Sequence, residues 1–359
     1  MKGLLIAYSF SPDKNVGALR PTYWAEEINQ FDGMSLDVVT ATPLDNSDKP
    51  YKRTVVANNS KSFWSFLIKD EGLTWRKDLL KYFKSTPIEE YDFVLFTGGP
   101  FFHFSLGKYL KKKGLKVIFD FRDPYSYNPR HNDKGLKKGI KIWFENKNLQ
   151  QADLVITVND ACHEYIGNGL KLNRQVIPNG FDERIIPKEK TDKLKYDLFY
   201  AGRFYWEPTD FFDGIQASDY SLAHAGVPQN YPHAFLQGNR FIQLGMLSQK
   251  EMYKELLLAE IGVVFTIDVP FESTTKLYDY LALNKKILVI TQGEPHTGVI
   301  KRELENYPNY RWVMNDKEDI LTAIKELKES PLVEFNATIF SRKQSLKNLV
   351  HQIKILFNA

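Results

Sequence analysis

The sequence predicts an α/β protein made of two Rossmann-like αβα domains. Strand-like apolar runs alternate with helix-like patterns along most of the chain, which is typical of βαβ units around a mostly parallel sheet. A charged segment, EKTDKLK at 189–195, follows the first series of runs, and a second series begins after it. The length of 359 residues also suits two domains of ordinary size.

The first series predicts strands separated, in most cases, by helices. The two clearest helices are expected at Arg20–Gln30 and Phe104–Lys113. The first strand lies within MKGLLIAYSF, and because no small-residue cleavage site follows this run, it is not read as a signal peptide. The strands are expected at Leu4–Ser9, Leu36–Thr40, Phe93–Phe96, Val117–Phe119, Leu154–Val158 and Gln175–Ile177.

The second series predicts a further set of strands before a final helix near Ser341–Phe357. We therefore divide the chain into residues 1–180, residues 181–340 and a C-terminal helix at residues 341–359. The strands of the second series are expected at Asp197–Ala201, Ala234–Leu236, Gly262–Phe265, Ile287–Ile290 and Tyr310–Met314.

The composition excludes several classes of protein. The formal charge of +4 and the pI of about 8.7 suit a phosphorylated ligand or an anionic membrane surface, but they lack the basic excess of a nucleic-acid binder. Cys162 is the only cysteine, so the chain has neither a disulfide framework nor a cysteine-based zinc site. No apolar run reaches the roughly 18 residues that a membrane span requires. We expect a cytoplasmic protein.

The stretch FESTTKLYDYLALNKKILVIT, residues 271–291, places polar side chains between a strand and a helix. In open α/β sheets, ligands bind at the carboxyl ends of strands, and the first N–H groups of the next helix attract anions. Ser273, Thr274 and Thr275 would add hydroxyl donors at this helix terminus, and Lys276 a full charge. These residues predict a seat for a phosphate or diphosphate. The alternative is an ordinary helix cap followed by a solvated lysine.

A second anion-binding element is expected after an earlier strand. The run DLFYAGR ends in Gly202 and Arg203, and a guanidinium at the end of a strand can bind phosphate oxygens in a fixed fork geometry. Glu272 and Asp279 flank the polar stretch, where a carboxylate could accept hydrogen bonds from sugar hydroxyl groups. The alternatives are an ordinary surface arginine and acids that stabilise the helix through its dipole.

Weaker candidates follow two strands of the first domain. Gly17 would let a ligand or the facing domain approach its loop closely, and Arg20 would meet an acceptor or donor phosphate. His103 follows Gly-Gly-Pro-Phe-Phe at another strand end, where it could touch the donor sugar. The alternatives are a simple turn around Gly17 and a structural role for His103.

Two segments of the first domain combine lysines with apolar residues. One is SFWSFLIK at 62–69, and the other lies within residues 134–144. Either segment could rest on anionic lipid and so give peripheral membrane contact. We prefer the simpler interpretation, a solvated charged face above an ordinary core stripe. The other segment combines Lys134, Lys137, Lys138 and Lys141 with Leu136, Ile140 and Phe144.

The order of the motifs resembles a known family. VIPNGFD (176–182), YAGR (200–203), GMLSQKEMYKELLLAEIGVVF (245–265) and FESTTKLYDYLALNKKILVI (271–290) resemble the carboxyl half of GT-B glycosyltransferases, especially glycosyltransferase family 4. AYSFSPDKNVGALR (7–20), DFRDPY (120–125) and FENKNLQQADLVITVND (144–160) resemble the amino half. The resemblance covers nearly the whole chain and lies in the order and spacing of the motifs. It implies two Rossmann-like domains facing across a cleft, and a last helix that crosses back to the first domain.

The resemblance implies a glycosyltransferase that moves a hexose-type sugar from a nucleoside diphosphate to a saccharide or lipid-linked acceptor, in cell-surface polysaccharide biosynthesis. The carboxyl domain would hold the nucleotide sugar, which is a co-substrate, and no separate cofactor is implied. The sequence has no Asp-x-Asp triplet, so no metal is expected. Family 4 implies transfer with retention, and Glu272 would orient the sugar ring. In an inverting enzyme, Asp123 would instead deprotonate the acceptor, beside Gly17, Arg20 and His103 on the acceptor side.

The chain also departs from the family pattern. Glu272-Ser-Thr-Thr-Lys replaces the acid-Gly-Phe-Gly loop, and Asp279 stands in place of a glutamate, one residue closer than usual. The lysine that usually follows the Gly-Arg strand is missing, and Lys276 would supply that charge beside Arg203. A GT-B sugar-nucleotide epimerase and a non-catalytic sugar-nucleotide-binding protein are the alternative interpretations.

Overall fold

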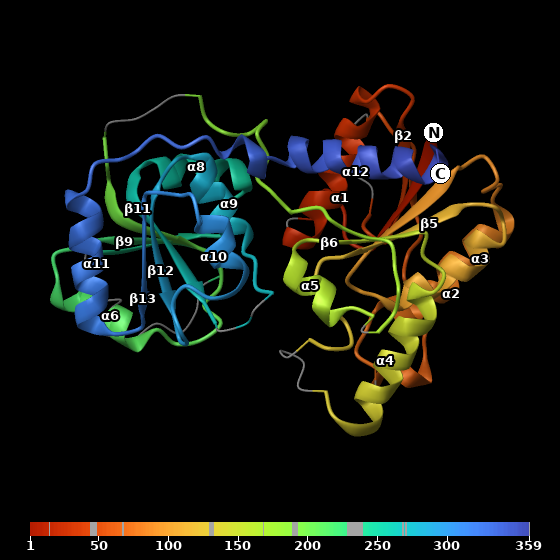
Figure 1. Ribbon diagram of the computed structural model, residues 1–359, viewed down its shortest axis with the longest axis horizontal. Helices are drawn as coiled ribbons and strands as arrows, with labels where there is room; N and C mark the ends of the chain where they lie inside the picture. The colour runs from red at the N-terminus through yellow and green to blue at the C-terminus, as the bar shows by residue number, and fades with distance from the viewer. Residues whose placement is uncertain are drawn as a thin grey trace. The chain divides into compact units, whose positions relative to one another are not determined.

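The computed structural model describes the chain in two compact units. It describes residues 1–359 except 14, 44–48, 67, 129–132, 168, 189–192, 228–239, 268, 270 and 359. Unit 1 comprises Met1–Asn179 and Ser345–Ala359, and unit 2 comprises Gly180–Gln344 (Figure 1). The strand expected at Ala234–Leu236 lies outside the described residues.

Unit 1 is built on a parallel sheet with the order β3-β2-β1-β4-β5-β6-β7 in the described part of the chain. The strands expected in the first series are all present. The additional strand β3 was missed because it is a short edge strand, Arg-Thr-Val, without alternating burial. The strands are β1 Lys2–Ala7, β2 Ser35–Thr40, β3 Arg53–Val55, β4 Phe93–Thr97, β5 Lys116–Phe121, β6 Leu154–Thr157 and β7 Arg174–Val176.

The helices of unit 1 begin earlier or break more often than their apolar periodicity suggests. Helix α1 starts at Val16 because the Asn15 side chain accepts a hydrogen bond from the Ala18 N–H and caps the helix. The helix expected at Phe104–Lys113 is divided into a 3-10 turn, η3, and a short α3. The helical segments are α1 Val16–Glu27, η1 Ile28–Gln30, η2 Phe63–Phe66, α2 Gly72–Ser85, η3 Phe102–Leu106, α3 Gly107–Lys111, α4 Gly135–Leu149, α5 Asp160–Tyr165 and α12 Arg342–Asn358.

Helix α12 completes the core of unit 1. Its residues Leu346, Leu349 and Ile353 are buried in the same apolar cluster as Leu5 of β1 and Trp24 of α1. The last helix is therefore held to unit 1 by burial of apolar surface, which is the main favourable term in folding.

Unit 2 repeats the arrangement with a parallel sheet whose order is β10-β9-β8-β11-β12-β13 in the described residues. Strand β9, Leu-Ala-His-Ala, was missed because it has no β-branched residue, and its neighbour β10 was missed at the sheet edge. The elements are β8 Tyr196–Ala201, α6 Thr209–Ala217, β9 Leu222–Ala225, β10 Phe241–Gly245, α8 Gln249–Leu257, β11 Ala259–Thr266, α9 Thr275–Ala282, β12 Lys286–Thr291, α10 Gly298–Leu304, β13 Tyr310–Met314, α11 Lys317–Glu329 and η5 Ala337–Phe340.

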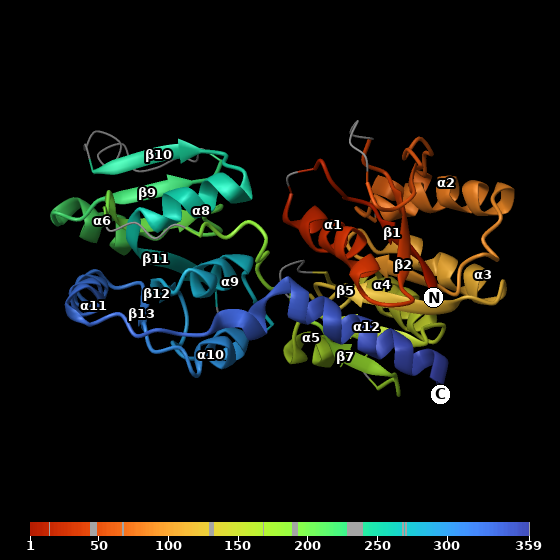
Figure 2. The same cartoon turned by 90° about the horizontal axis from the view of Figure 1, so that it is seen from above.

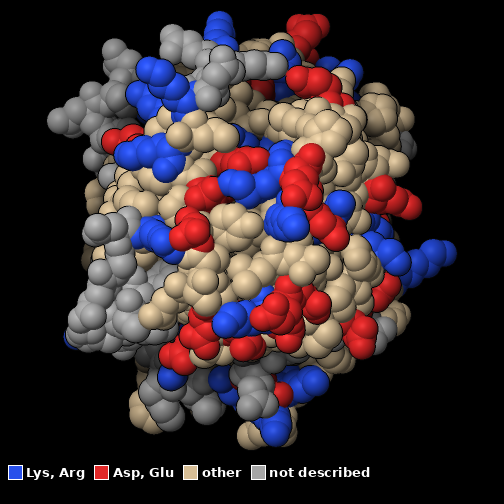
Figure 3. Space-filling model, turned by 90° about the vertical axis from the view of Figure 1, so that its left-hand side faces the viewer, with Lys and Arg blue, Asp and Glu red and all other residues tan. Residues whose placement is uncertain are grey.

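Helices cover both faces of the sheet of unit 2. Figure 2 shows α8, α9 and α10 on one face and α6 and α11 on the other, and separate apolar clusters fill the two interfaces. On the face of unit 2 seen in Figure 3, acidic and basic side chains are interspersed over the described residues, whereas nucleic-acid-binding surfaces are predominantly basic.

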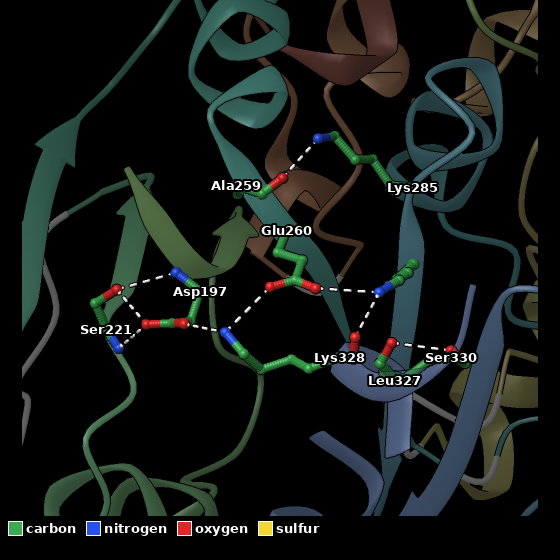
Figure 4. Close-up of polar contacts among 9 residues, drawn as sticks. Asp197, Ser221, Ala259, Glu260, Lys285, Leu327, Lys328 and Ser330 are labelled. Carbon is green, nitrogen blue, oxygen red and sulfur yellow. Dashed lines mark hydrogen bonds and ion pairs between the residues drawn. The ribbon is translucent and has the colours of Figure 1, made fainter. Parts of the chain in front are cut away.

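An ion-pair network ties α11 to the amino ends of the strands of unit 2 (Figure 4). Lys328 of α11 pairs with Asp197 at the start of β8 and, at 3.1 Å, with Glu260 at the start of β11. Glu260 also pairs with Lys286 of β12 at 3.1 Å. Because these contacts occupy the amino edge, they hold the strands in register without using the carboxyl edge, where ligands bind in this class of sheet.

Candidate functional site

The candidate site lies at the point of unit 2 where the strand order reverses. Strands β8 and β11 are neighbours in the sheet, but the chain leaves them in opposite directions, toward β9 and β12. Gly202 and Arg203 follow β8, and Glu272–Thr275 follow β11 and lead into α9. The structure thus brings both predicted anion-binding segments to the topological switch point, which is where open α/β sheets bind ligands.

Gly202 and Lys276 are in direct contact. A Cβ atom added to Gly202 would lie 2.3 Å from Cε and 2.8 Å from Nζ of Lys276, and the φ of Gly202 is +129°. The Lys276 ammonium also lies 5.2 Å from the centre of the Tyr200 ring. Burial lowers the pKa of Lys276 to about 8, although Glu272 and Asp279 act in the opposite direction. Lys276 is therefore a partly desolvated cation, and an anionic ligand would stabilise its charged form.

The backbone that carries Arg203 is held by three hydrogen bonds. The Gly202 N–H donates to the Ala225 carbonyl at 2.7 Å, and the Tyr200 hydroxyl donates to the Arg203 carbonyl at 2.6 Å. Nε2 of His224 lies 2.7 Å from the Gly202 carbonyl. Burial lowers the pKa of His224, so the neutral ring donates this bond. The Arg203 side chain itself is exposed and makes no ion pair with the described residues.

Helix α9 begins at this site without a side-chain cap. The Thr274 side chain forms no capping hydrogen bond, so the first N–H groups of the helix remain directed toward the loop. Thr274 and Thr275 are half-buried. An uncapped helix terminus beside Lys276 and Arg203 is an arrangement that favours a bound anion.

Ser273 contacts a residue that the sequence patterns did not indicate. Its hydroxyl donates to Glu303 of α10 at 2.9 Å and lies 3.1 Å from the Tyr278 hydroxyl, which also donates to Glu303. Burial raises the pKa of Glu303 to about 7, and its Oε2 atom has no hydrogen-bond partner among the described residues. Glu303 lies 30 positions from Ser273, so no local pattern could reveal this contact.

The Glu272 carboxylate forms hydrogen bonds within the loop that carries it. Its Oε2 atom accepts hydrogen bonds from the Thr266 hydroxyl at 2.8 Å and from the Ile267 N–H at 3.0 Å. Glu272 also lines a small surface hollow with Thr291, Thr297 and Trp312, near the carboxyl ends of β11 and β12. These contacts hold the Glu272 side chain within its loop, and its position beside the hollow is compatible with the predicted contact to a sugar.

Asp279 lies on the buried side of α9. Only 6% of its surface is exposed, and its carboxylate accepts hydrogen bonds from the Tyr253 hydroxyl and, at 3.3 Å, from the Gln249 amide. Burial raises the pKa of Asp279 to about 6, while the bond from Tyr253 and the charge of Arg342 oppose the shift. In this conformation the carboxylate binds protein groups, and a sugar hydroxyl would have to replace one of them.

The candidates of unit 1 also meet near the switch point of their sheet, between β1 and β4. Arg122 donates to the Gly17 carbonyl at 2.6 Å and to the Gly98 carbonyl at 2.5 Å, and thereby joins the start of α1 to the loop that follows β4. Asp123, beside it, is exposed at the end of β5.

Arg20 and His103 are both buried. The Arg20 guanidinium pairs with Asp120 at 3.2 Å and donates to the Ile177 and Pro178 carbonyls at 2.7 and 2.8 Å, with 4% of the residue exposed. His103 is fully buried, and burial lowers its pKa to about 3. These surroundings favour structural roles for both side chains.

The described residues offer neither a metal cluster nor a membrane-spanning helix. Among the residues that the structure describes, no three His, Cys, Asp or Glu side chains lie close enough to share a metal ion. Over the same residues, no helix has both the length and the apolar character needed to cross a membrane.

The comparisons with known proteins agree with the fold. Residues 22–184 match the family model described as Glycosyltransferase Family 4, while no curated protein matches the sequence. The solved sucrose-phosphate synthase from Thermosynechococcus elongatus is 12% identical, with 99% of each chain covered and a TM-score of 0.72.

Two other structures have similar folds. The lipopolysaccharide outer core galactosyltransferase WaaB is 14% identical, with 98% of this chain and 99% of that chain covered and a TM-score of 0.61. A UDP-N-acetylglucosamine 2-epimerase is 10% identical, with 100% of this chain and 97% of that chain covered and a TM-score of 0.60. The resemblance to GT-B glycosyltransferases, and to glycosyltransferase family 4 over residues 22–184, is thereby confirmed, and the chain has the GT-B fold of two Rossmann-like domains.

Proposed function

We propose that the protein is a glycosyltransferase that moves a hexose-type sugar from a nucleoside diphosphate to a saccharide or lipid-linked acceptor, in cell-surface polysaccharide assembly. One observation carries the proposal: the Lys276 ammonium lies against Gly202, next to Arg203 and the uncapped start of α9. Three cationic or partly positive groups therefore converge at a switch point. Sugar-nucleotide use by proteins of this fold, including a UDP-N-acetylglucosamine 2-epimerase, supports the same ligand class.

Unit 2 would hold the donor through its diphosphate. Arg203 would bind one phosphate through its guanidinium fork, and Lys276 with the α9 N–H groups would bind the other. As the bond between sugar and phosphate breaks, negative charge grows on the leaving nucleotide, and groups already aimed at that position stabilise the transition state. A partly desolvated lysine is effective here because its interaction with charge is less screened than in water.

We further propose that these groups replace a divalent ion and that the sugar is transferred with retention. The leaving phosphate would take the acceptor's proton on the face that the acceptor attacks, while Glu272 orients the sugar ring. Activity that disappears with EDTA and returns with manganese would contradict the first point. An NMR time course of the anomeric proton tests the second, because a product of inverted configuration would refute retention.

Unit 1 would bind the acceptor. The exposed carboxylate of Asp123 is the candidate base if the enzyme inverts. Gly17 lies in the first turn of α1, where its carbonyl accepts a hydrogen bond from Arg122. Arg20 and His103, being buried, would act by supporting the carboxyl edge of this sheet rather than by touching the acceptor.

A thermal-shift screen with UDP, GDP and other nucleoside diphosphates tests donor binding, because a ligand of the folded state raises its stability by RT ln(1 + [L]/Kd). We expect stabilisation in the wild type and its loss in Arg203→Ala. Arg311→Ala is a matched control, since Arg311 lies on β13 and pairs with Glu326 at 2.7 Å. Equal shifts in the wild type and in Arg203→Ala would refute the seat.

Product analysis then separates the candidate activities. Transfer requires an acceptor and releases the nucleoside diphosphate. Formation of an isomeric nucleotide sugar without an acceptor would instead identify an epimerase, an activity known for a protein of the same fold. Donor binding without either product would identify a non-catalytic sugar-nucleotide-binding protein.

A further inference from the structure

Helix α4 of unit 1 has its polar side turned toward the protein. Its buried residues include Lys141, Glu145 and Asn148, which are 8%, 2% and 8% exposed. Leu136 and Trp143, by contrast, are 81% and 60% exposed. A surface helix of a globular protein normally buries its apolar stripe, whereas α4 buries two charged side chains and exposes two large apolar ones.

This orientation is stabilised by specific contacts. The Glu145 carboxylate accepts hydrogen bonds from the Ser126 N–H and hydroxyl at 3.1 and 2.8 Å and from the Gly167 N–H at 3.1 Å. Lys141 pairs with Asp133 and lies 5.0 Å from the centre of the Tyr125 ring. Because a buried carboxylate or ammonium is costly unless it is paired, turning α4 around would break these contacts and expose their partners.

The preferred interpretation from the sequence, an ordinary core stripe, is therefore wrong for much of this helix. Phe144 does pack inward, with its ring stacked on Phe102 at 4.0 Å. Leu136 and Trp143, however, share the outer face, because residues seven apart lie on the same side of a helix. Ile140, between them, is half-exposed.

The charged side chains that α4 and its N-cap expose are basic. Residues 133–149 contain five lysines and only two acids, and one of the acids, Glu145, is buried. Lys147 lies 4.5 Å from the centre of the Trp143 ring, so its aliphatic part covers the indole while its charge reaches outward. Lys134, at the N-cap, is also exposed, whereas Lys138, two residues after Leu136, projects from the other side of the helix and lies 5.1 Å from the centre of the Tyr127 ring.

A second exposed apolar pair lies on a neighbouring segment. Phe63 and Trp64 of η2 are 80% and 56% exposed. The chain then reaches Asp70, whose carboxylate accepts from the Phe101 and Phe102 N–H groups at 3.0 and 3.4 Å, and the Phe102 ring is the one that stacks on α4. Asp70, in the segment after η2, and Phe144 of α4 therefore both contact Phe102. In Figure 1, α4 lies at the lower edge of unit 1, far from α12.

We propose that the outer face of α4, defined by Leu136, Trp143 and Lys147 together with Lys134 at the start of the helix, docks on an anionic lipid surface. Leucine and tryptophan would enter the headgroup region while the lysines contact lipid phosphates, which is the arrangement of interfacial helices. The basic charges favour an anionic surface, and the exposed leucine and tryptophan favour one with an apolar layer beneath its charged groups, as an anionic bilayer has. The surface itself is independent of the donor site, and only its use with a lipid-linked acceptor rests on the proposed function.

Co-flotation with vesicles tests the proposal on the full-length protein. We expect binding to phosphatidylglycerol vesicles, little binding to phosphatidylcholine vesicles, and a decrease at high salt. Replacing Lys134 and Lys147 by glutamine should lower the partition coefficient about fivefold for each lysine. The double variant Leu136→Ala/Trp143→Ala should lower it about tenfold or more.

Matched controls come from unit 2. Ile339, 67% exposed, and Lys325, whose side chain is 70% exposed, lie on other elements, so Ile339→Ala and Lys325→Gln should leave vesicle binding unchanged. Affinity for nucleoside diphosphate, measured without lipid, should be the same in all variants. Failure of the docking surface and failure of the donor site are thus distinguishable.

Two results would overturn the proposal. One is equal vesicle binding by the wild type and by the α4 variants, or none by the wild type. The other is a dimer in size-exclusion chromatography that the Leu136→Ala/Trp143→Ala variant dissociates, because the face would then be covered by a second copy of the chain.

Discussion

Replacing Gly202 with alanine should damage the donor site and the stability of unit 2 by two separable effects. The φ of +129° is unfavourable for alanine and should lower the free energy of unfolding by about 1–3 kcal/mol. The new Cβ would also lie 2.3 Å from Cε of Lys276 and force the ammonium away. Hydrogen bonds to charged groups contribute about 1.5–3 kcal/mol, so loss of the lysine contact should weaken nucleoside diphosphate binding by about ten- to a hundredfold.

Calorimetric titration with the nucleoside diphosphate and denaturant unfolding measure the two effects. Gly245→Ala is the matched control, because Gly245 lies in the same unit with φ +69° and an added Cβ would meet nothing within 4 Å. It should lose stability but keep its affinity. In a Lys276→Ala background, Gly202→Ala should cause little further loss of affinity, which is the coupling expected of residues in contact.

The reasoning fails if Gly202→Ala binds the nucleotide as tightly as Gly245→Ala does. It also fails if Gly202→Ala weakens binding equally with and without Lys276, because the glycine would then act through something other than the lysine.

The remaining predictions concern charge at the two sites. Arg203→Ala should lower transfer turnover by about 10²-fold, lysine at this position should rescue poorly because the fork is lost, and wild-type kinetics would refute the role. Because burial lowers the pKa of Lys276 to about 8, nucleotide affinity should fall as the pH rises from 7 to 9.5, and an unchanged affinity would contradict this. Burial raises the pKa of Glu303 to about 7 from 4.5, so the folded state binds more protons and the free energy of unfolding should fall as the pH rises through that interval. Glu303→Gln should flatten this dependence in denaturant titrations at pH 5 and pH 8, and equal slopes would show that another group is responsible. Asp123→Asn should leave the melting temperature unchanged, and a loss of turnover would then identify a chemical role for Asp123. A large drop in stability would instead identify a turn-forming role.

The alternation of strands and helices determined the fold class, because strand and helix periodicities are local properties of the sequence. It also placed Gly202 and Arg203 after one strand and Ser273–Lys276 after another. The strands that local patterns missed, β3, β9 and β10, are short, and β9 also lacks β-branched residues, so only pairing with their neighbours reveals them.

Only the tertiary structure decided which residues meet. The adjacency of β8 and β11 puts Lys276 against Gly202, although they are far apart in sequence. The pairing of Arg20 with Asp120 converts an expected ligand contact into a buried ion pair. Glu303 joins Ser273 through the placement of α10.

The orientation of α4 shows most clearly what local sequence patterns leave undecided. The sequence of this helix contains apolar and charged residues at helical spacing, and that pattern by itself favours burial of the apolar side. The structure instead buries Glu145, because its hydrogen-bond donors come from Ser126 and Gly167, on segments before and after the helix. Periodicity records only the neighbours along one helix, whereas the free energy that orients a helix depends on the groups that the rest of the fold brings against it.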